Sequence, residues 1–106
     1  MPTPTELYDQ ADKLKEQGKL EEAIALLHQA LELDPNFALA HSALAVYYGR
    51  LGRHEEAIRH GLKVVELEPN DPFSYTAMSV TFQRAGRIPE AEEFKARAHM
   101  VGMQRH

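Results

Sequence analysis

The sequence predicts an all-α fold, a solenoid of three helix-turn-helix hairpins with six helices of about 12–15 residues. Two observations predict it. Residues recur every 34 positions along the chain of 106 residues, which is typical of a repeat architecture. Within each half-repeat, apolar residues recur at three- and four-residue steps, and no window alternates as a strand does. The recurring residues are Gly18, Gly52 and Gly86, then Ala23, Ala57 and Ala91.

Boundary signals delimit the predicted helices in order. A capping box opens the first helix, with Thr3 as N-cap, Pro4 in the first turn and Glu6 reaching back. The three glycines at the 34-residue step end the first helix of each hairpin, because glycine readily adopts the left-handed conformation. The other signals are Asp34-Pro35 and Glu68-Pro69 after the second and fourth helices, and Asp71-Pro72 and Ile88-Pro89 before the fifth and sixth.

The length fits a single domain, residues 1–106, with repeats at about 4–37, 38–71 and 72–105. The chain has no cysteine, which excludes disulfides, thiolate nucleophiles and cysteine-zinc sites. It has no long apolar run for a membrane span and no secretory signal, so we expect a cytoplasmic protein. Its net charge of −4 argues against nucleic-acid binding through bulk charge.

No catalytic or metal-binding motif is present in the sequence. There is no glycine-rich phosphate loop, no Ser-His-Asp context and no His-Glu-x-x-His pattern, so we expect neither an enzyme nor a cofactor. The six histidines include no pair at i,i+3 or i,i+4, so we expect no metal site. We expect His41 to be a partly buried core residue, and His28, His60 and His99 to lie on helix surfaces.

The pattern resembles that of tetratricopeptide repeat (TPR) proteins over essentially the whole chain. The resemblance implies a right-handed solenoid that acts as a scaffold or adaptor and binds a protein or peptide partner on its concave face. The residues that carry it are Leu7, His41 and Tyr75 at the large site of the first helices, Ala11, Ala45 and Ser79 at the small site, and Leu14, Tyr48 and Phe82 at the aromatic site.

The sequence departs from the family pattern at three places. The large second-helix site holds Gly61 in the second repeat and Lys95 in the third. We expect Tyr75 to fill the space beside Gly61, the alternative being that Gly61 faces solvent. Lys95 suits an end repeat, whose outer face meets water. The chain also stops at His106 without an extra capping helix.

The resemblance implies that the first helix of each hairpin lines the concave groove. The sides of these helices opposite the core carry an apolar track, and exposed apolar surface of this kind marks interaction sites. We expect Arg50 and Arg84 to meet one acidic group of a bound segment. In the alternative, Leu39 and Phe73 cover helix starts and both arginines are solvated. The predicted groove residues are Tyr8, Asp12, Leu39, Ser42, Val46, Gly49, Arg50, Phe73, Thr76, Val80, Gln83 and Arg84.

A second hypothesis is structural self-association. Met100, Val101 and Met103 leave apolar surface near the C-terminus, and the repeats carry charges of −5, −1 and +2, which makes the two ends complementary. In the alternative, this gradient is incidental and screened by salt. We expect no chaperone-type carboxylate clamp. The positions that correspond to the Lys, Asn and Arg of that clamp hold Tyr8, Asp12, Ala43, Phe73 and Ala77.

Overall fold

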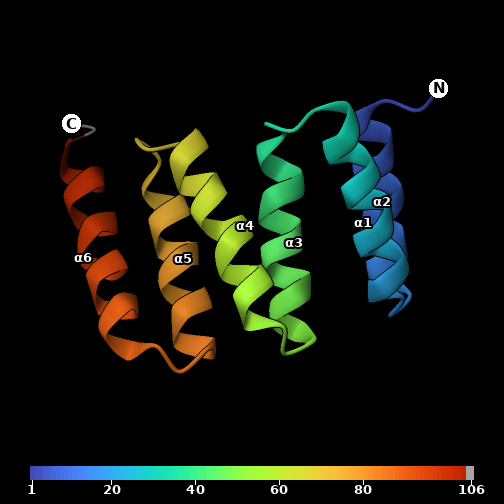
Figure 1. Ribbon diagram of the computed structural model, residues 1–106. Helices are drawn as coiled ribbons and strands as arrows, with labels where there is room; N and C mark the ends of the chain where they lie inside the picture. The colour runs from blue at the N-terminus through green and yellow to red at the C-terminus, as the bar shows by residue number, and fades with distance from the viewer. Residues whose placement is uncertain (105–106) are drawn as a thin grey trace.

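The computed structural model describes residues 1–104 and shows an all-α solenoid of three antiparallel helix hairpins (Figure 1). Successive helices pack side by side along the chain, so the predicted fold class is confirmed. The expected end of the third repeat, at residue 105, lies outside the described residues. The helices are α1 (Pro4–Glu16), α2 (Leu20–Leu33), α3 (Ala38–Arg50), α4 (His54–Leu67), α5 (Pro72–Arg84) and α6 (Ile88–Gln104).

The turn inside each hairpin has the same geometry in all three repeats. Gly18, Gly52 and Gly86 each have a φ of 78°, the left-handed conformation that the sequence predicts. The amide after each glycine donates a hydrogen bond of 2.9 Å to the carbonyl five residues earlier, as in Lys19 to Leu14. This is a Schellman motif, which satisfies carbonyls at the helix end and turns the chain back on itself.

Side-chain caps start two of the helices. The hydroxyl of Thr3 accepts from the amide of Glu6 at 3.1 Å, and the carboxylate of Asp71 accepts from the amide of Phe73 at 3.0 Å. The Glu6 carboxylate accepts from the Thr3 hydroxyl instead of reaching the Thr3 amide, so the capping box is only half formed. α2 and α4 have no side-chain cap, but both carry two glutamates in the first turn that complement the helix dipole.

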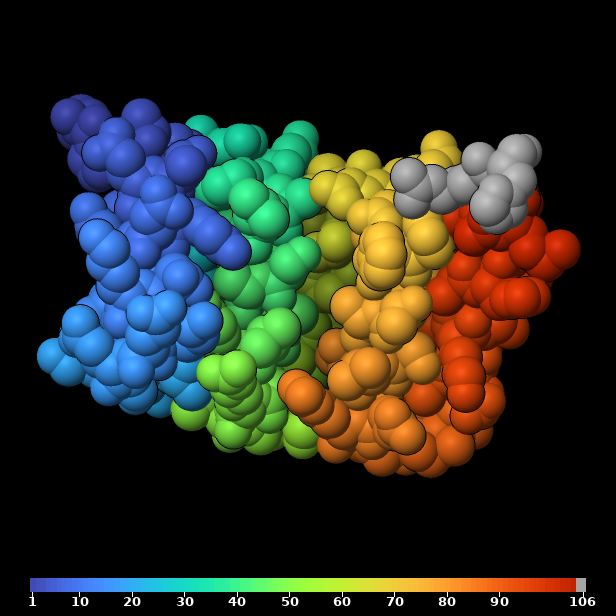
Figure 2. Space-filling model, turned by 180° about the vertical axis from the view of Figure 1, so that it is seen from behind, coloured from blue at the N-terminus to red at the C-terminus, as the bar shows by residue number. Residues whose placement is uncertain are grey.

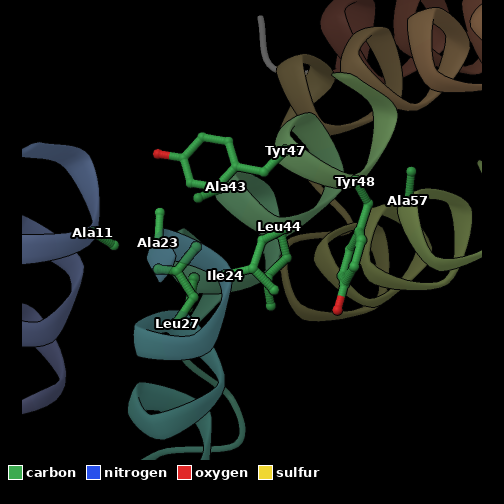
Figure 3. Close-up of a cluster of buried hydrophobic side chains, with 10 residues drawn as sticks. Ala11, Ala23, Ile24, Leu27, Ala43, Leu44, Tyr47, Tyr48 and Ala57 are labelled. Carbon is green, nitrogen blue, oxygen red and sulfur yellow. The ribbon is translucent and has the colours of Figure 1, made fainter. Parts of the chain in front are cut away.

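The buried apolar residues form two clusters that meet at α4. The first cluster spans α1 to α4, and Figure 3 shows Leu44 of α3 against Ile24 and Leu27 of α2. The second spans α4 to α6 and includes Tyr75, Met78, Phe82 and Phe94. Each hairpin therefore buries its apolar face against the next one, as expected for a repeat protein.

Gly61 lies at the joint between the second and third hairpins. It is buried, and a β-carbon built on it would lie 2.6 Å from the sulfur of Met78. The expectation that Tyr75 fills this space is wrong, as is the alternative that Gly61 faces solvent. Met78 on α5 fills the space because its unbranched, flexible side chain reaches across to α4. Tyr75 instead donates to the carbonyl of Pro69 at 2.9 Å.

A cluster of histidines joins α2, α3 and α4. His41 is buried, as expected, but His60 is also buried at 8% exposure and His28 is half-buried, so the expected surface positions of these two are wrong. The rings of His28 and His60 lie 5.7 Å apart, and the ring of Tyr48 stacks on His60 with centroids 5.8 Å apart. The sequence pattern did not reveal this because the histidines come from three different helices.

The hydrogen bonds of this cluster fix its proton positions. The Pro35 carbonyl can only accept, so His41 donates to it through Nε2 at 2.8 Å. In neutral His41, Nδ1 must then accept, so His60 donates from its own Nδ1 at 3.0 Å. His60 Nε2 is left buried without a hydrogen-bond partner in the described structure. Burial, with the neighbouring His41 second, lowers the pKa of His60 from 6.5 to about 4.

The third repeat ends the stack differently from the other two. α6 has 17 residues, longer than the expected 12–15, and Lys95 is exposed as expected for an end repeat. Phe94, one position before Lys95, is buried at 7% exposure. Its ring packs on Phe82 with centroids 5.3 Å apart and on Tyr75 at 6.2 Å. An aromatic side chain therefore closes the last core cluster although the expected aromatic position is a lysine.

Candidate functional site

A groove of about 460 Å³ lies between α3 and α5, with α4 along its floor. Figure 2 shows this face, where α4 (yellow-green) is recessed between α3 (green) and α5 (orange). Six of the twelve predicted groove residues lie here: Leu39, Ser42, Val46, Phe73, Val80 and Arg84.

Four large apolar side chains line the walls of this groove and remain exposed. On α5, Phe73 is 75% exposed and Val80 is 41% exposed, and on α3 Leu39 and Val46 are 54% and 42% exposed. The two residues on each helix are seven positions apart, which places both on one face of the helix. Phe73 is too exposed to serve as a cover for the start of its helix. The groove is therefore an open apolar surface of the kind that marks interaction sites.

Small side chains shape the floor. Ala45 and Ser42 on α3, Ser74 and Ala77 on α5, and Gly61 on α4 all line the groove. Because none of them projects far from its backbone, the floor lies deeper than the apolar walls. The floor was not predicted from the sequence, because it forms only where α3, α4 and α5 pack together, although the departure at Gly61 was a signal that this position is unusual.

The two ends of the groove carry opposite charges. Glu68 and Asp71 line the end near the α4–α5 loop, and Arg84 lines the other end. The Arg84 guanidinium lies beside α3, with Nη1 3.9 Å from where a β-carbon of Gly49 would be. No salt bridge within residues 1–104 involves any of these three charged side chains.

A second, smaller hollow of about 260 Å³ lies between α1 and α3. The predicted residues Tyr8, Asp12 and Arg50 line it, and it shares Ser42 and Val46 with the main groove. Asp12 forms an ion pair with Lys15 at 3.0 Å, and this contact raises the pKa of Lys15. Arg50 and Arg84 thus line different hollows.

Of the three remaining predicted groove residues, Gly49 lies on α3 beside the Arg84 guanidinium, and the other two lie elsewhere on α5. Thr76 and Gln83 line a third hollow, between α5 and α6, with Val80 at its border with the main groove. The single continuous track expected from the sequence is therefore divided into three hollows. Helix periodicity alone cannot locate this division, because it depends on how the helices pack against one another.

The residues expected to support self-association differ in exposure. Met100 and Met103 are 58% and 63% exposed on α6. Val101 is half-buried and packs against the second core cluster, so only the two methionines offer side chains fully to a second molecule.

Within residues 1–104, no group of three or more histidine, aspartate or glutamate side chains is placed to hold a metal ion. None of the six helices described above combines the length and apolarity needed to cross a bilayer.

The fold and the groove define a helical-hairpin repeat protein. Two family models match it: one described as TPR repeat over residues 11–52 and one described as tetratricopeptide repeat over residues 38–71. Together they cover residues 11–71, more than half of the chain, and the chain belongs to the tetratricopeptide repeat family. The members of this family are protein-interaction modules and not enzymes. A search of curated proteins gave no match.

Solved structures agree on the fold. A crystal structure of MamA superposes with a TM-score of 0.89 and 20% identity, over 97% of this chain and 60% of that one. The second TPR domain of Spaghetti (RPAP3), bound to the HSP90 peptide SRMEEVD, superposes with a TM-score of 0.83 and 18% identity, over 93% of this chain and 92% of that one. YrrB, described as a TPR protein with an unusual peptide-binding site, superposes with a TM-score of 0.84 and 21% identity, over 95% of this chain and 52% of that one. The chain thus spans about half to three-fifths of MamA and YrrB.

Proposed function

We propose that the protein is an interaction module that binds a peptide segment of a partner protein in the groove between α3 and α5. The observation that carries the proposal is the set of exposed apolar side chains on both walls, Leu39 and Val46 opposite Phe73 and Val80. Two similar structures, those of Spaghetti and YrrB, are described with a bound peptide or a peptide-binding site, which supports this use of the fold.

Phe73 is the residue on which we expect binding to depend most. Aromatic side chains dominate the binding energy of interfaces, and Phe73 is the most exposed apolar side chain of the groove. A peptide laid against α5 would cover its ring and remove that apolar surface from water, which is favourable. Because the ring is already solvated in the free protein, replacing it leaves the fold intact.

The test is binding of peptides selected by phage display on the purified protein. We expect Phe73→Ala to weaken the selected peptides by about tenfold or more, which is the loss of an interface anchor of about 1.4 kcal/mol or more. The matched control is Leu62→Ala, an exposed apolar residue of α4 that lines no part of the groove. Equal affinity of Phe73→Ala and the unchanged protein, or an equal loss in Leu62→Ala, would contradict the proposal.

A second candidate function is self-association through the end of α6. The exposure of Met100 and Met103 favours it, since two large apolar side chains one helical turn apart form a small apolar patch. Light scattering at increasing protein concentration tests it. We expect a rise in mass that Met100→Lys abolishes, and a constant monomer mass would refute this candidate.

A further inference from the structure

We infer that the occupant of the groove is an extended peptide with an acidic residue at one end, apolar residues in the middle and a basic residue at the other end. This inference rests on the proposed function and adds the chemistry of the partner. The observation that carries it is the arrangement of Arg84 at one end of the groove and Glu68 and Asp71 at the other, with apolar walls between them.

Charge complementarity selects such a peptide over the alternatives. A segment with two acidic ends would place a carboxylate beside Glu68, and one with two basic ends would place a cation beside Arg84. Like charges brought together in this way oppose binding, so a mixed segment is preferred. The Arg84 guanidinium lies against α3 at this end of the groove, with Nη1 3.9 Å from where a β-carbon of Gly49 would be.

The length of α5 sets the spacing of the peptide charges. Asp71 and Arg84 are 13 positions apart at the two ends of α5, which corresponds to about 20 Å at the helical rise of 1.5 Å per residue. An extended peptide covers that distance in about six residues. Side chains six positions apart lie on the same face of an extended strand, as do the two residues at even positions between them. These two would be the apolar residues that enter the groove toward the floor at Gly61.

The experiment measures fluorescence anisotropy of synthetic labelled peptides that share two leucines at the inner even positions. The end positions, six residues apart, carry Glu and Arg in either order, two Glu, two Arg or two Gln. We expect the better mixed peptide to bind about fivefold to tenfold more tightly than either like-charged peptide, which is the scale of a few exposed charge contacts. The advantage shrinks as salt is added, because the charges are exposed.

Charge-reversal variants then redirect the preference. Arg84→Glu makes both ends acidic, so we expect the two-Arg peptide to become the tightest. Glu68→Arg makes the acidic end less negative, so we expect the two-Glu peptide to gain. Glu66→Arg is the control, because Glu66 pairs with Lys63 and lines no part of the groove, and it should leave the ranking unchanged.

The outcomes separate this inference from the proposed function. If all peptides bind equally and Phe73→Ala weakens them all, the groove binds peptides but the charge inference is wrong. If no peptide binds, or if Phe73→Ala has no effect on binding, the proposed function fails as well. If the groove is instead occupied by a second copy of the chain, light scattering shows a dimer that the mixed peptide does not dissociate, which also overturns the inference.

Discussion

Gly61 and Met78 face each other at the joint between the second and third hairpins. The contact explains why glycine is present in a helix interior, where it costs about 1 kcal/mol relative to alanine. A β-carbon at this position would lie 2.6 Å from the Met78 sulfur, which is closer than van der Waals contact allows. The sulfur is inside the side chain instead of at its free end, so Met78 must move as a whole to make room.

We predict that Gly61→Ala destabilises the protein by about 1 kcal/mol, because overpacking outweighs the gain in helix propensity. The matched controls are Gly49→Ala and Gly102→Ala. At both sites a β-carbon would lie 3.9 Å from its nearest neighbour, which is ordinary contact. We expect both control variants to have a free energy of unfolding about 0.5–1 kcal/mol higher than the unchanged protein in urea denaturation. A gain of the same size in Gly61→Ala would show that Met78 does not constrain the site.

His60 makes the stability depend on pH. Its pKa is about 4 in the folded protein and 6.5 when exposed, so the unfolded chain binds more protons between these values. The stabilisation is therefore fully present above about pH 6.5 and is lost as the pH falls toward 4. The groups that affect this pKa are His28 of α2, His41 of α3, and Arg59 and Glu56 of α4, of which only Glu56 favours the charged form.

We predict a loss of about 2 kcal/mol in the free energy of unfolding between about pH 7 and pH 5 that is due to His60. The measurement is urea denaturation at several pH values in His60→Phe, which keeps a ring against Tyr48, and in the unchanged protein. In His60→Phe, the free energy of unfolding should fall less steeply as the pH is lowered from about 7 to about 5, because the contribution of His60 is gone. His99→Gln is the control, since His99 is exposed on α6, and it should retain the slope. Equal slopes in all three proteins would mean that His60 is protonated without cost.

The sequence predicts the role of some residues better than that of others. Thr3 and Asp71 are helix caps as predicted, because capping depends on residues that are close in sequence. The contacts of Met78 and of His60 were not predicted, because each side chain meets a partner on another helix. Which residue of α5 reaches α4 depends on how the hairpins pack, and the repeat pattern does not specify this.

At the scale of the elements, the three hairpin turns are the features most strongly specified by sequence. Each combines a glycine at a φ of 78° with the same pair of backbone hydrogen bonds, so one residue type at a fixed step determines three turns. In the second and third repeats the turns also share a side-chain arrangement. Arg53 lies over the Tyr48 ring and Arg87 lies over the Phe82 ring, at 4.8 and 5.1 Å.

We predict that Gly52→Ala destabilises the protein by about 1–2 kcal/mol, which is the cost of the left-handed conformation for a residue with a β-carbon. No neighbouring atom lies within 4 Å of the new β-carbon, so the loss would report backbone strain alone. The measurement is thermal denaturation of this variant and of the unchanged protein. Gly49→Ala, three residues earlier in a regular helix, serves as the control. A neutral Gly52→Ala would indicate that the turn relaxes to another geometry.

At the scale of the whole molecule, α4 is the element that links the two halves. Ala57 belongs to the first core cluster and Ile58 to the second, so successive residues of one helix pack against different clusters. The same helix provides the floor of the groove through Gly61 and Val64. The groove therefore lies beside the joint on which the stacking of the second and third hairpins depends.

The sequence predicts the walls of the groove but not its extent. Periodicity places Leu39, Val46, Phe73 and Val80 on exposed helix faces, and the structure brings these four together. Periodicity does not show how the helices pack against one another. It therefore could not predict that the expected single track is divided into three hollows. The acidic end was also missed, because Glu68 and Asp71 lie in the connection between two helices and belong to neither periodic pattern.

The most direct measurement is NMR chemical-shift mapping of the ¹⁵N-labelled protein with a peptide selected by phage display. If the groove binds the peptide, the largest changes lie on α3 and α5, at Leu39, Val46, Phe73 and Val80, and the outer face of α4 around Leu62 stays unchanged. Changes concentrated on α6 around Met100, with none along α3 and α5, would contradict the account.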